Sequence, residues 1–380
     1  MRFSRGSDEE TDMAGHRIRV FATAAAALTL TLGIAACGSD DDGGGGGGGD
    51  GDSKIALLLP ETKTTRYEEQ DRPNFERRVK ELCSGCEVIY SNANQDPAKQ
   101  QQQAEAAITQ GAKVIVISSV DVKSAAAIVE RAAQSDVKVV AYGRLIPDAP
   151  IDYYVSIDPF KVGQQQAEVQ MDAIEQDGAS APKVVMINGA PTDSNAKPYK
   201  DGATQTLEER GADVVKSFDT PDWSPDEAQQ EMESSITDLG NDGFDAVYVA
   251  NDGMAGGAIA ALKGANIDPA TRFVTGQDAE LAGIQRILAG EQLMTVYQPI
   301  IQIAETAAEI AVPLAQGKKP PADAAPEKVD NGEKQVPSAL LATIAIEEDN
   351  IKSTVVKDGF LKIPDICTGQ YEQACQEAGL

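Results

Sequence analysis

Residues 113–143 read KVIVISSVDVKSAAAIVERAAQSDVKVVAYG. Runs rich in valine and isoleucine open and close this stretch, at 113–118 and 137–143, and 122–135 between them carries apolar residues at helical spacing. Buried parallel strands have this continuous apolar character, and a helix that connects two of them completes a βαβ unit. The stretch therefore predicts an α/β fold with a parallel sheet.

The same alternation continues on both sides of this unit and restarts after Pro159. Further strands are expected at 54–60, 87–92, 153–158, 183–189, 245–252 and 272–278. Further helices are expected at 68–82, 97–110, 164–176, 195–210, 225–239 and 254–263. The pattern predicts two doubly wound α/β lobes, and the Pro-, Ala-, Lys- and Glu-rich stretch 319–337 is expected to be a surface connection.

The amino-terminal residues have the pattern of an export signal followed by a linker. Arg17 and Arg19 precede an apolar run, 21–36, that ends in Ile-Ala-Ala before Cys37, and a Gly/Asp-rich segment follows. We predict a lipoprotein signal peptide at 1–36, lipidation of Cys37 and a flexible tether at 37–53. The protein would then be extracytoplasmic, held to the outer face of the cell membrane by its lipid alone. A signal-anchor helix with an incidental cysteine is the alternative, and translation could start at Met13.

Composition excludes several classes of function. The formal net charge of −27 disfavours nucleic acid as a partner, because an acidic surface repels phosphate backbones. The single histidine, His16, lies in the predicted signal peptide. The mature chain would therefore lack the base of Ser-His-Asp and Cys-His systems and the usual zinc ligand. We expect no catalytic residues, metal or cofactor.

The cysteines that follow Cys37 form two close pairs, Cys83 with Cys86 and Cys367 with Cys375. Outside the cytoplasm such pairs usually become disulfides. The Cys-x-x-Cys pair could instead be a redox site, but it ends a predicted helix, whereas a redox motif of that type starts one. The pair near the carboxyl terminus is expected to fasten the tail at 367–380.

Polar side chains follow many of the expected strands, which is where parallel sheets place ligand sites. These residues are Arg66, Tyr67, Arg144, Asp158, Asn195, Asn251, Asp252 and Asp278. Their amides, carboxylates and guanidinium groups suit neighbouring hydroxyls, and the rings of Tyr67 and Trp223 suit the apolar face of a pyranose. The set favours a sugar, although Trp223 could be ordinary core and Asp252 is expected to cap the next helix.

At these residues the chain resembles the xylose-binding proteins and related monosaccharide-binding components of ABC transporters, in the ribose/galactose class. The resemblance lies in TRYEEQDRPNF (65–75), VVAYGRLIPDAPIDYYVSID (139–158), NGAPTDSNAK (188–197), VYVANDGMAGGAIAAL (247–262), VTGQDAELAGIQRI (274–287), TVYQPI (295–300) and VKDGF (356–360). It implies a type I periplasmic-binding-protein fold, two α/β lobes joined by a three-strand hinge. The lobes are expected at 54–158 plus 298–325 and at 159–297 plus 326–366.

The resemblance also implies roles for particular residues. Arg66 and Tyr67 would form the first-lobe wall, with Arg144 at the polar edge of the sugar. From the second lobe Asn195, Asn251 and Asp278 would bind hydroxyls while Trp223 stacks, and Asp158 and Gln298 would lie at hinge crossings. The chain departs from the xylose-binding pattern at Gly143, Pro159 and Gln298, where the pattern has Asp, Asn and Lys.

The implied function is capture of one monosaccharide, a xylose-like pentose or related aldose, and its delivery by a monomeric protein to an ABC transporter permease. A sensory role, in which the closed form engages a membrane receptor, is the alternative. The enzyme alternative is a glycosidase whose catalytic groups are the carboxylates of Asp158 and Asp278. A repressor of the lactose type would need a DNA-reading helix pair where this chain has an export signal.

Overall fold

The structure is a computed structural model that describes residues 53–380. The predicted signal peptide, the Cys37 lipidation site and the tether as far as residue 52 lie outside the described residues. Within residues 53–380 no helix combines the length and the apolar composition that crossing a bilayer requires.

The first lobe is built on a seven-stranded sheet in the order β10-β11-β5-β4-β3-β1-β2. Every neighbouring pair is parallel except β10 with β11. The strands are β1 (Lys54–Leu59), β2 (Glu87–Asn92), β3 (Ala112–Ile117), β4 (Lys138–Tyr142), β5 (Tyr153–Ile157), β10 (Glu327–Asp330) and β11 (Gln335–Leu341).

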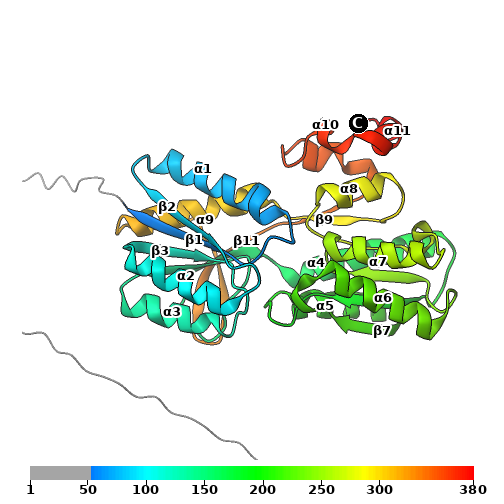
Figure 1. Ribbon diagram of the computed structural model, residues 1–380, viewed down its shortest axis with the longest axis horizontal. Coiled ribbons are helices and arrows are strands. Elements are labelled where there is room, and N and C mark those ends of the chain that lie inside the picture. Colours follow the sequence, from blue (N-terminus) through cyan, green and yellow to red (C-terminus); the bar gives the residue numbers. More distant parts are fainter. Residues whose placement is uncertain (1–52) are drawn as a thin grey trace, which may run out of the picture. The chain divides into compact units, whose positions relative to one another are not determined.

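Side chains alternate between the two faces of this sheet, and each face has its own helical layer. In β1, Ile55 and Leu57 belong to the core beneath α1 (Arg72–Leu82) and α9 (Ile300–Ala315). Ala56 and Leu58 belong to the opposite core, beneath α2 (Pro97–Thr109) and α3 (Ala125–Gln134). Figure 1 shows α1 beside α9 on one face and α2 with α3 on the other. The lobe is doubly wound, as predicted.

The second lobe has a three-stranded parallel sheet in the order β7-β6-β8 and a two-stranded antiparallel pair, β9 with β12. Its strands are β6 (Lys183–Asn188), β7 (Asp213–Asp219), β8 (Ala246–Val249), β9 (Thr295–Tyr297) and β12 (Ile344–Ile346). Its helices are α4 (Pro159–Gln176), α5 (Ala196–Glu209), α6 (Pro225–Leu239), α7 (Asp252–Gly264) and α8 (Leu281–Leu288). Helix α4 packs against α5, and α6 against α7.

The chain passes between the two lobes three times. Residues 157–159 lead from β5 to α4, residues 297–300 from β9 to α9, and residues 341–344 from β11 to β12. Three crossing segments are what the predicted fold requires, and the type I fold class is confirmed.

The predicted boundary of the second lobe is wrong after residue 326. Strand β11 pairs with β5, with Ser338 opposite Tyr154, so 327–341 belongs to the first-lobe sheet rather than to the second lobe. The stretch 319–337 is therefore not only a surface connection, since it contains β10 and the start of β11. Strand β10 is an edge strand of sequence EKVD, and charged edge strands are hard to tell from loops by composition.

The strand expected at 272–278 is also absent from the described structure. Phe273 and Asp278 have φ angles of 43° and 90°, which an extended strand cannot accommodate. The segment still runs beside β8, because the Thr275 backbone N–H donates to the carbonyl of Val247 (3.2 Å).

Both predicted cysteine pairs form disulfides, Cys83–Cys86 and Cys367–Cys375. The first follows the carboxyl end of α1, as expected for a structural bridge. The second joins the end of α10 (Ile363–Ile366) to α11 (Glu372–Glu377). The side chain of Gln285 in α8 donates to the carbonyl of Ile366 (3.1 Å), which fastens the tail to the second lobe.

Candidate ligand-binding cavity

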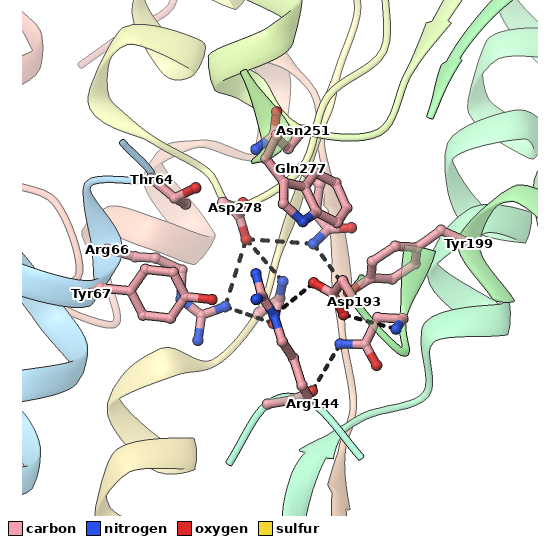
Figure 2. A pocket seen from close by; sticks show the side chains of 13 residues that line it. Thr64, Arg66, Tyr67, Arg144, Asp193, Tyr199, Asn251, Gln277 and Asp278 are labelled. Carbon is pink, nitrogen blue, oxygen red and sulfur yellow. Dashed lines mark hydrogen bonds and ion pairs between the residues drawn. The ribbon is translucent and has the colours of Figure 1, made fainter. Parts of the chain in front are cut away.

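A cavity lies where both lobes present the carboxyl ends of their strands, and its empty volume, which includes space open to solvent, is about 440 Å³. The residues that line it are Thr64, Arg66, Tyr67, Gly143, Arg144, Asp193, Asn195, Tyr199, Trp223, Asn251, Gln277, Asp278 and Gln298. Figure 2 shows Arg66 and Tyr67 on one side and Tyr199 on the other, with Arg144 and Asp278 between them.

The cavity contains every residue predicted to bind ligand except Asp158. That carboxylate caps α4, where it accepts the Lys161 backbone N–H (3.3 Å), and its other oxygen pairs with the Lys161 ammonium at 3.0 Å. Asp158 follows a strand but turns back onto its own helix, so the prediction that it lines the site is wrong. The carboxylate pair that a glycosidase would need, Asp158 with Asp278, is not assembled.

Arg66 is held in the first-lobe wall by a two-point ion pair. Its Nε and Nη2 each lie 2.9 Å from an oxygen of Asp71, and the Tyr142 hydroxyl also donates to Asp71. Asp71 is 1% exposed, so this geometry is fixed inside the lobe. The remaining nitrogen, Nη1, points into the cavity.

Gln298 connects this arginine with the second lobe. Its Oε1 accepts from Arg66 Nη1 (3.0 Å), while its Nε2 donates to Asp278 Oδ1 (2.9 Å). Arg66 Nη1 also lies 3.6 Å from the same Asp278 oxygen. Burial raises the pKa of Asp278, and the charge of Arg66 opposes that rise. A neutral amide thus joins a buried cation to a buried carboxyl, and all three groups face the cavity.

A second set of contacts joins the lobes on the opposite side of the cavity. Arg144, which follows β4, places its Nε 2.7 Å from Asp193 Oδ2, and both side chains are 5% exposed. The Asn195 amide donates to the carbonyl of Gly143 (2.8 Å), and Asp193 in turn accepts the Asn195 backbone N–H (2.8 Å). The two walls therefore contact each other directly in this conformation.

Trp223 is placed in the wall by an unusual backbone. Asp222 and Trp223 have φ angles of 55° and 54°, a left-handed conformation that non-glycine residues adopt at a cost of about 1–3 kcal/mol each. A Cβ on Gly189 would lie 2.0 Å from the indole, so only glycine leaves room for the ring there. Tyr199 packs against Trp223 edge-on, with the ring centroids 6.3 Å apart. The indole lines the cavity and also packs into the hydrophobic core of the lobe.

Five residues line the cavity but are not among the predicted ligand residues: Thr64, Gly143, Asp193, Tyr199 and Gln277. Asp193 and Gln277 lie within two residues of Asn195 and Asp278, so wider windows after each strand would have found them. Tyr199 lies inside α5 and carries no such signal.

Asp252 does not cap the next helix, contrary to prediction. Asn251 is the cap, because its Oδ1 accepts the Met254 backbone N–H (2.9 Å). The Asp252 carboxylate is fully buried and accepts hydrogen bonds from Gln292 (2.7 Å) and Thr295 (2.9 Å). Burial raises the pKa of Asp252 to about 7.

Glu280 is a second buried acid, beside Asp252, and it reaches across to the first lobe. Its Oε1 accepts the Thr65 backbone N–H (3.1 Å). Burial, reinforced by the charges of Asp252 and Asp278, raises the pKa of Glu280 to about 8. This acid belongs to the contact between the lobes rather than to the cavity lining.

The arrangement suits a compact, neutral ligand with many hydroxyls. Amide, carboxylate and guanidinium groups line one cavity together with three aromatic side chains, Tyr67, Tyr199 and Trp223. Among residues 53–380 no cluster of three or more acidic or cysteine side chains could hold a metal ion. The groups that line the cavity can form hydrogen bonds and pack against a ring.

Comparison with known proteins also indicates a protein that binds a small ligand. Residues 55–319 match the family model described as a periplasmic binding protein domain. The chain is 39% identical over 313 residues to the D-xylose-binding periplasmic protein of Escherichia coli K12, covering 81% of this chain and 91% of that one. It is 31% identical over 324 residues to a multiple sugar-binding periplasmic receptor of Rhizobium radiobacter, covering 81% and 90%.

Solved structures agree. An ABC transporter solute-binding protein of Clostridium phytofermentans with bound β-D-glucose superposes with a TM-score of 0.73 at 27% identity, covering 82% of this chain and 99% of that one. A carbohydrate transporter solute-binding protein of Chloroflexus aurantiacus in complex with D-glucose gives a TM-score of 0.73 at 28% identity, covering 82% and 97%. The chain therefore belongs to the periplasmic binding protein family, and it is a solute-binding protein rather than an enzyme.

Proposed function

We propose that this protein captures one monosaccharide, a xylose-like pentose or a related aldose, outside the cytoplasm and delivers it to an ABC transporter permease. The observation that carries the proposal is the cavity that gathers the predicted ligand residues, apart from Asp158, from both lobes. The relatives named above, described as binding D-xylose, several sugars or D-glucose, support it.

The chemistry of the lining supports a sugar over other small solutes. A pyranose has an apolar face, which Trp223 would cover, and a rim of hydroxyls that both donate and accept. Asn195, Asn251 and Asp278 present the amide and carboxyl groups that bind such hydroxyls in pairs. A sugar with one hydroxyl inverted would leave a buried group unpaired, at a cost of about 1–3 kcal/mol, so the site would discriminate epimers.

Capture would proceed by rotation of the lobes about the three crossing segments. The ligand would dock on one wall of an open form, and closure would bring the second wall onto it and exclude water, which strengthens each hydrogen bond. The direct contacts between the walls, Arg144 with Asp193 and Thr65 with Glu280, would hold the closed form.

Lipidation of Cys37 would keep the protein at the membrane surface while the tether leaves the lobes free to reach the permease. Mass spectrometry of the amino-terminal peptide from the membrane fraction tests this. An acylated Cys37 is expected, and an unmodified Cys37 in membrane-bound protein would contradict it.

Calorimetric titration with D-xylose, D-ribose, L-arabinose, D-glucose and D-galactose tests the binding proposal. We expect at least one of them to bind with one site per chain. Asp278→Asn should weaken that binding at least tenfold, whereas Asp158→Asn, which keeps a capping side chain outside the cavity, should not change it. Absence of binding by all five sugars would contradict the proposal.

A further inference from the structure

Two polar atoms in the cavity wall are buried and have no hydrogen-bond partner. They are Oε1 of Gln277 and Nε1 of Trp223, and the two residues are 3% and 7% exposed. A buried polar atom without a partner costs about 1–3 kcal/mol, so each such atom in a folded protein calls for an explanation. One is an acceptor and the other a donor, and both residues line the cavity.

The orientation of the Gln277 amide is fixed by its neighbours. Its Nε2 lies 3.4 Å from Asp278 Oδ1 and 3.3 Å from the Tyr199 hydroxyl. Asp278 Oδ1 accepts from the amide nitrogen, so the carbonyl oxygen of Gln277 faces away from that carboxyl. In this orientation Oε1 is the amide atom that has no partner.

The free N–H of Trp223 belongs to the same corner of the cavity. Tyr199, which contacts the Gln277 amide, also packs edge-on against the indole. The left-handed backbone at Trp223 and the close approach to Gly189 hold the indole in place, so its N–H cannot simply turn to another acceptor.

Unpartnered atoms also occur away from the cavity, and they provide a comparison. Gln170 in α4 is likewise buried with a free Oε1, and its Nε2 donates to the carbonyl of Phe273 (2.7 Å). What distinguishes Gln277 and Trp223 is that both residues line the cavity, whereas Gln170 does not.

We propose that Gln277 is a specificity-determining residue, whose Oε1 accepts a hydrogen bond from a ligand hydroxyl while Trp223 Nε1 donates one to a ligand oxygen. The inference rests on the proposed function and deepens it. A ligand must carry a hydroxyl at the position that faces Gln277, so a sugar that lacks this group leaves the acceptor unpaired and binds more weakly.

A cycle of variants and deoxy sugars tests the proposal. D-Xylose and its 2-, 3- and 4-deoxy analogues are titrated against the wild type, Gln277→Met and the control Gln170→Met. We expect Gln277→Met to weaken D-xylose at least tenfold and Gln170→Met to change it less than twofold. The analogue that lacks the hydroxyl facing Gln277 should bind the wild type and Gln277→Met equally. Without that hydroxyl, the wild-type Oε1 has nothing to accept, so removing Oε1 costs no further affinity.

Trp223→Phe is a second arm that does not depend on the folding of Gln277→Met, since it keeps an aromatic ring but loses the N–H together with part of the ring system. It should also weaken D-xylose, and the loss should be smaller with one of the analogues, because the loss of ring packing is common to all of them. D-Glucose and its monodeoxy analogues replace the xylose series if D-glucose binds more tightly.

The outcomes separate the two proposals. The loss of affinity caused by Gln277→Met is compared between D-xylose and each deoxy analogue. If the wild type binds sugar and this loss is the same for the parent and for every analogue, Gln277 contacts no hydroxyl and the inference is overturned. Unchanged binding of D-xylose by Gln277→Met would overturn it as well. If the wild type binds none of the sugars, the proposed function and the inference both fail.

Discussion

Trp223 is the single tryptophan of the chain, and it lies in the cavity wall on a left-handed backbone against Gly189. Its fluorescence therefore reports on the site without any label. A strained backbone of this kind persists only where the surrounding contacts hold it in place. The conformation is therefore consistent with an indole ring that is fixed in position before a ligand binds.

Replacing Gly189 by alanine should displace this ring. A new Cβ would lie 2.0 Å from the indole, so we expect a shifted emission spectrum and a loss of sugar affinity at least as large as that of Trp223→Ala, about 1 kcal/mol or more. Fluorescence titration checks both. Gly264→Ala, where nothing lies near the added carbon, is the control. An unchanged spectrum and affinity in Gly189→Ala would remove Trp223 from the pocket.

Residue-level prediction succeeded where a polar side chain directly follows a strand. Arg144 and Asn251 were found in this way and do line the cavity. The rule failed for Asp158, because a carboxylate at the start of a helix can bind its own backbone N–H groups instead of a ligand. It could not find Tyr199, since an aromatic residue within a helix looks the same in sequence whether it faces a core or a site.

At the scale of elements, helix α7 begins at the cavity, and its cap serves both the helix and the site. Asn251 Oδ1 accepts the Met254 N–H, which leaves the amide nitrogen for a ligand. The Asn251 side chain thus both stabilises the amino-terminal end of α7 and forms part of the cavity lining.

Substitutions at Asn251 should separate these two roles. Asn251→Ser keeps a capping oxygen and removes the amide, whereas Asn251→Ala removes both. We expect the serine variant to be more stable than the alanine variant by about 1 kcal/mol, with sugar affinity reduced at least tenfold in both. Chemical unfolding and calorimetric titration measure the two effects. Wild-type affinity in Asn251→Ser would show that the amide does not contact the ligand.

Element prediction followed the strength of the local pattern. The ranges 87–92 and 225–239 match β2 and α6, because apolar periodicity and a proline at the first helical turn mark their ends. Strand β10 was missed because three of its four residues are charged, and the assignment of β11 to a lobe depends on its partner β5, nearly two hundred residues earlier. Pairing over such distances leaves no trace in a single sequence.

At the scale of the whole molecule, buried acids link the stability of the fold to pH. Glu280 has a folded-state pKa of about 8, above that of an unfolded glutamate. A carboxyl whose pKa is raised by folding stabilises the protein fully below its unfolded pKa, and this contribution is lost as pH rises through the folded value. Asp252, at about 7, acts in the same direction.

The free energy of unfolding should therefore fall between about pH 5 and pH 8, and Glu280→Gln should flatten that fall. Glutamine stays neutral at every pH and can still accept the Thr65 N–H. Denaturant unfolding at a series of pH values measures the slope. Glu130→Gln on the exposed side of α3 is the control, and an identical pH profile in Glu280→Gln and wild type would contradict the assignment.

A crystal structure of the protein grown with its most tightly bound sugar would show directly whether one monosaccharide lies between the lobes. We expect a single sugar ring over Trp223, with its hydroxyls bonded to Asn195, Asn251 and Asp278. An empty cavity in the presence of saturating sugar, or a sugar bound elsewhere on the protein, would contradict it.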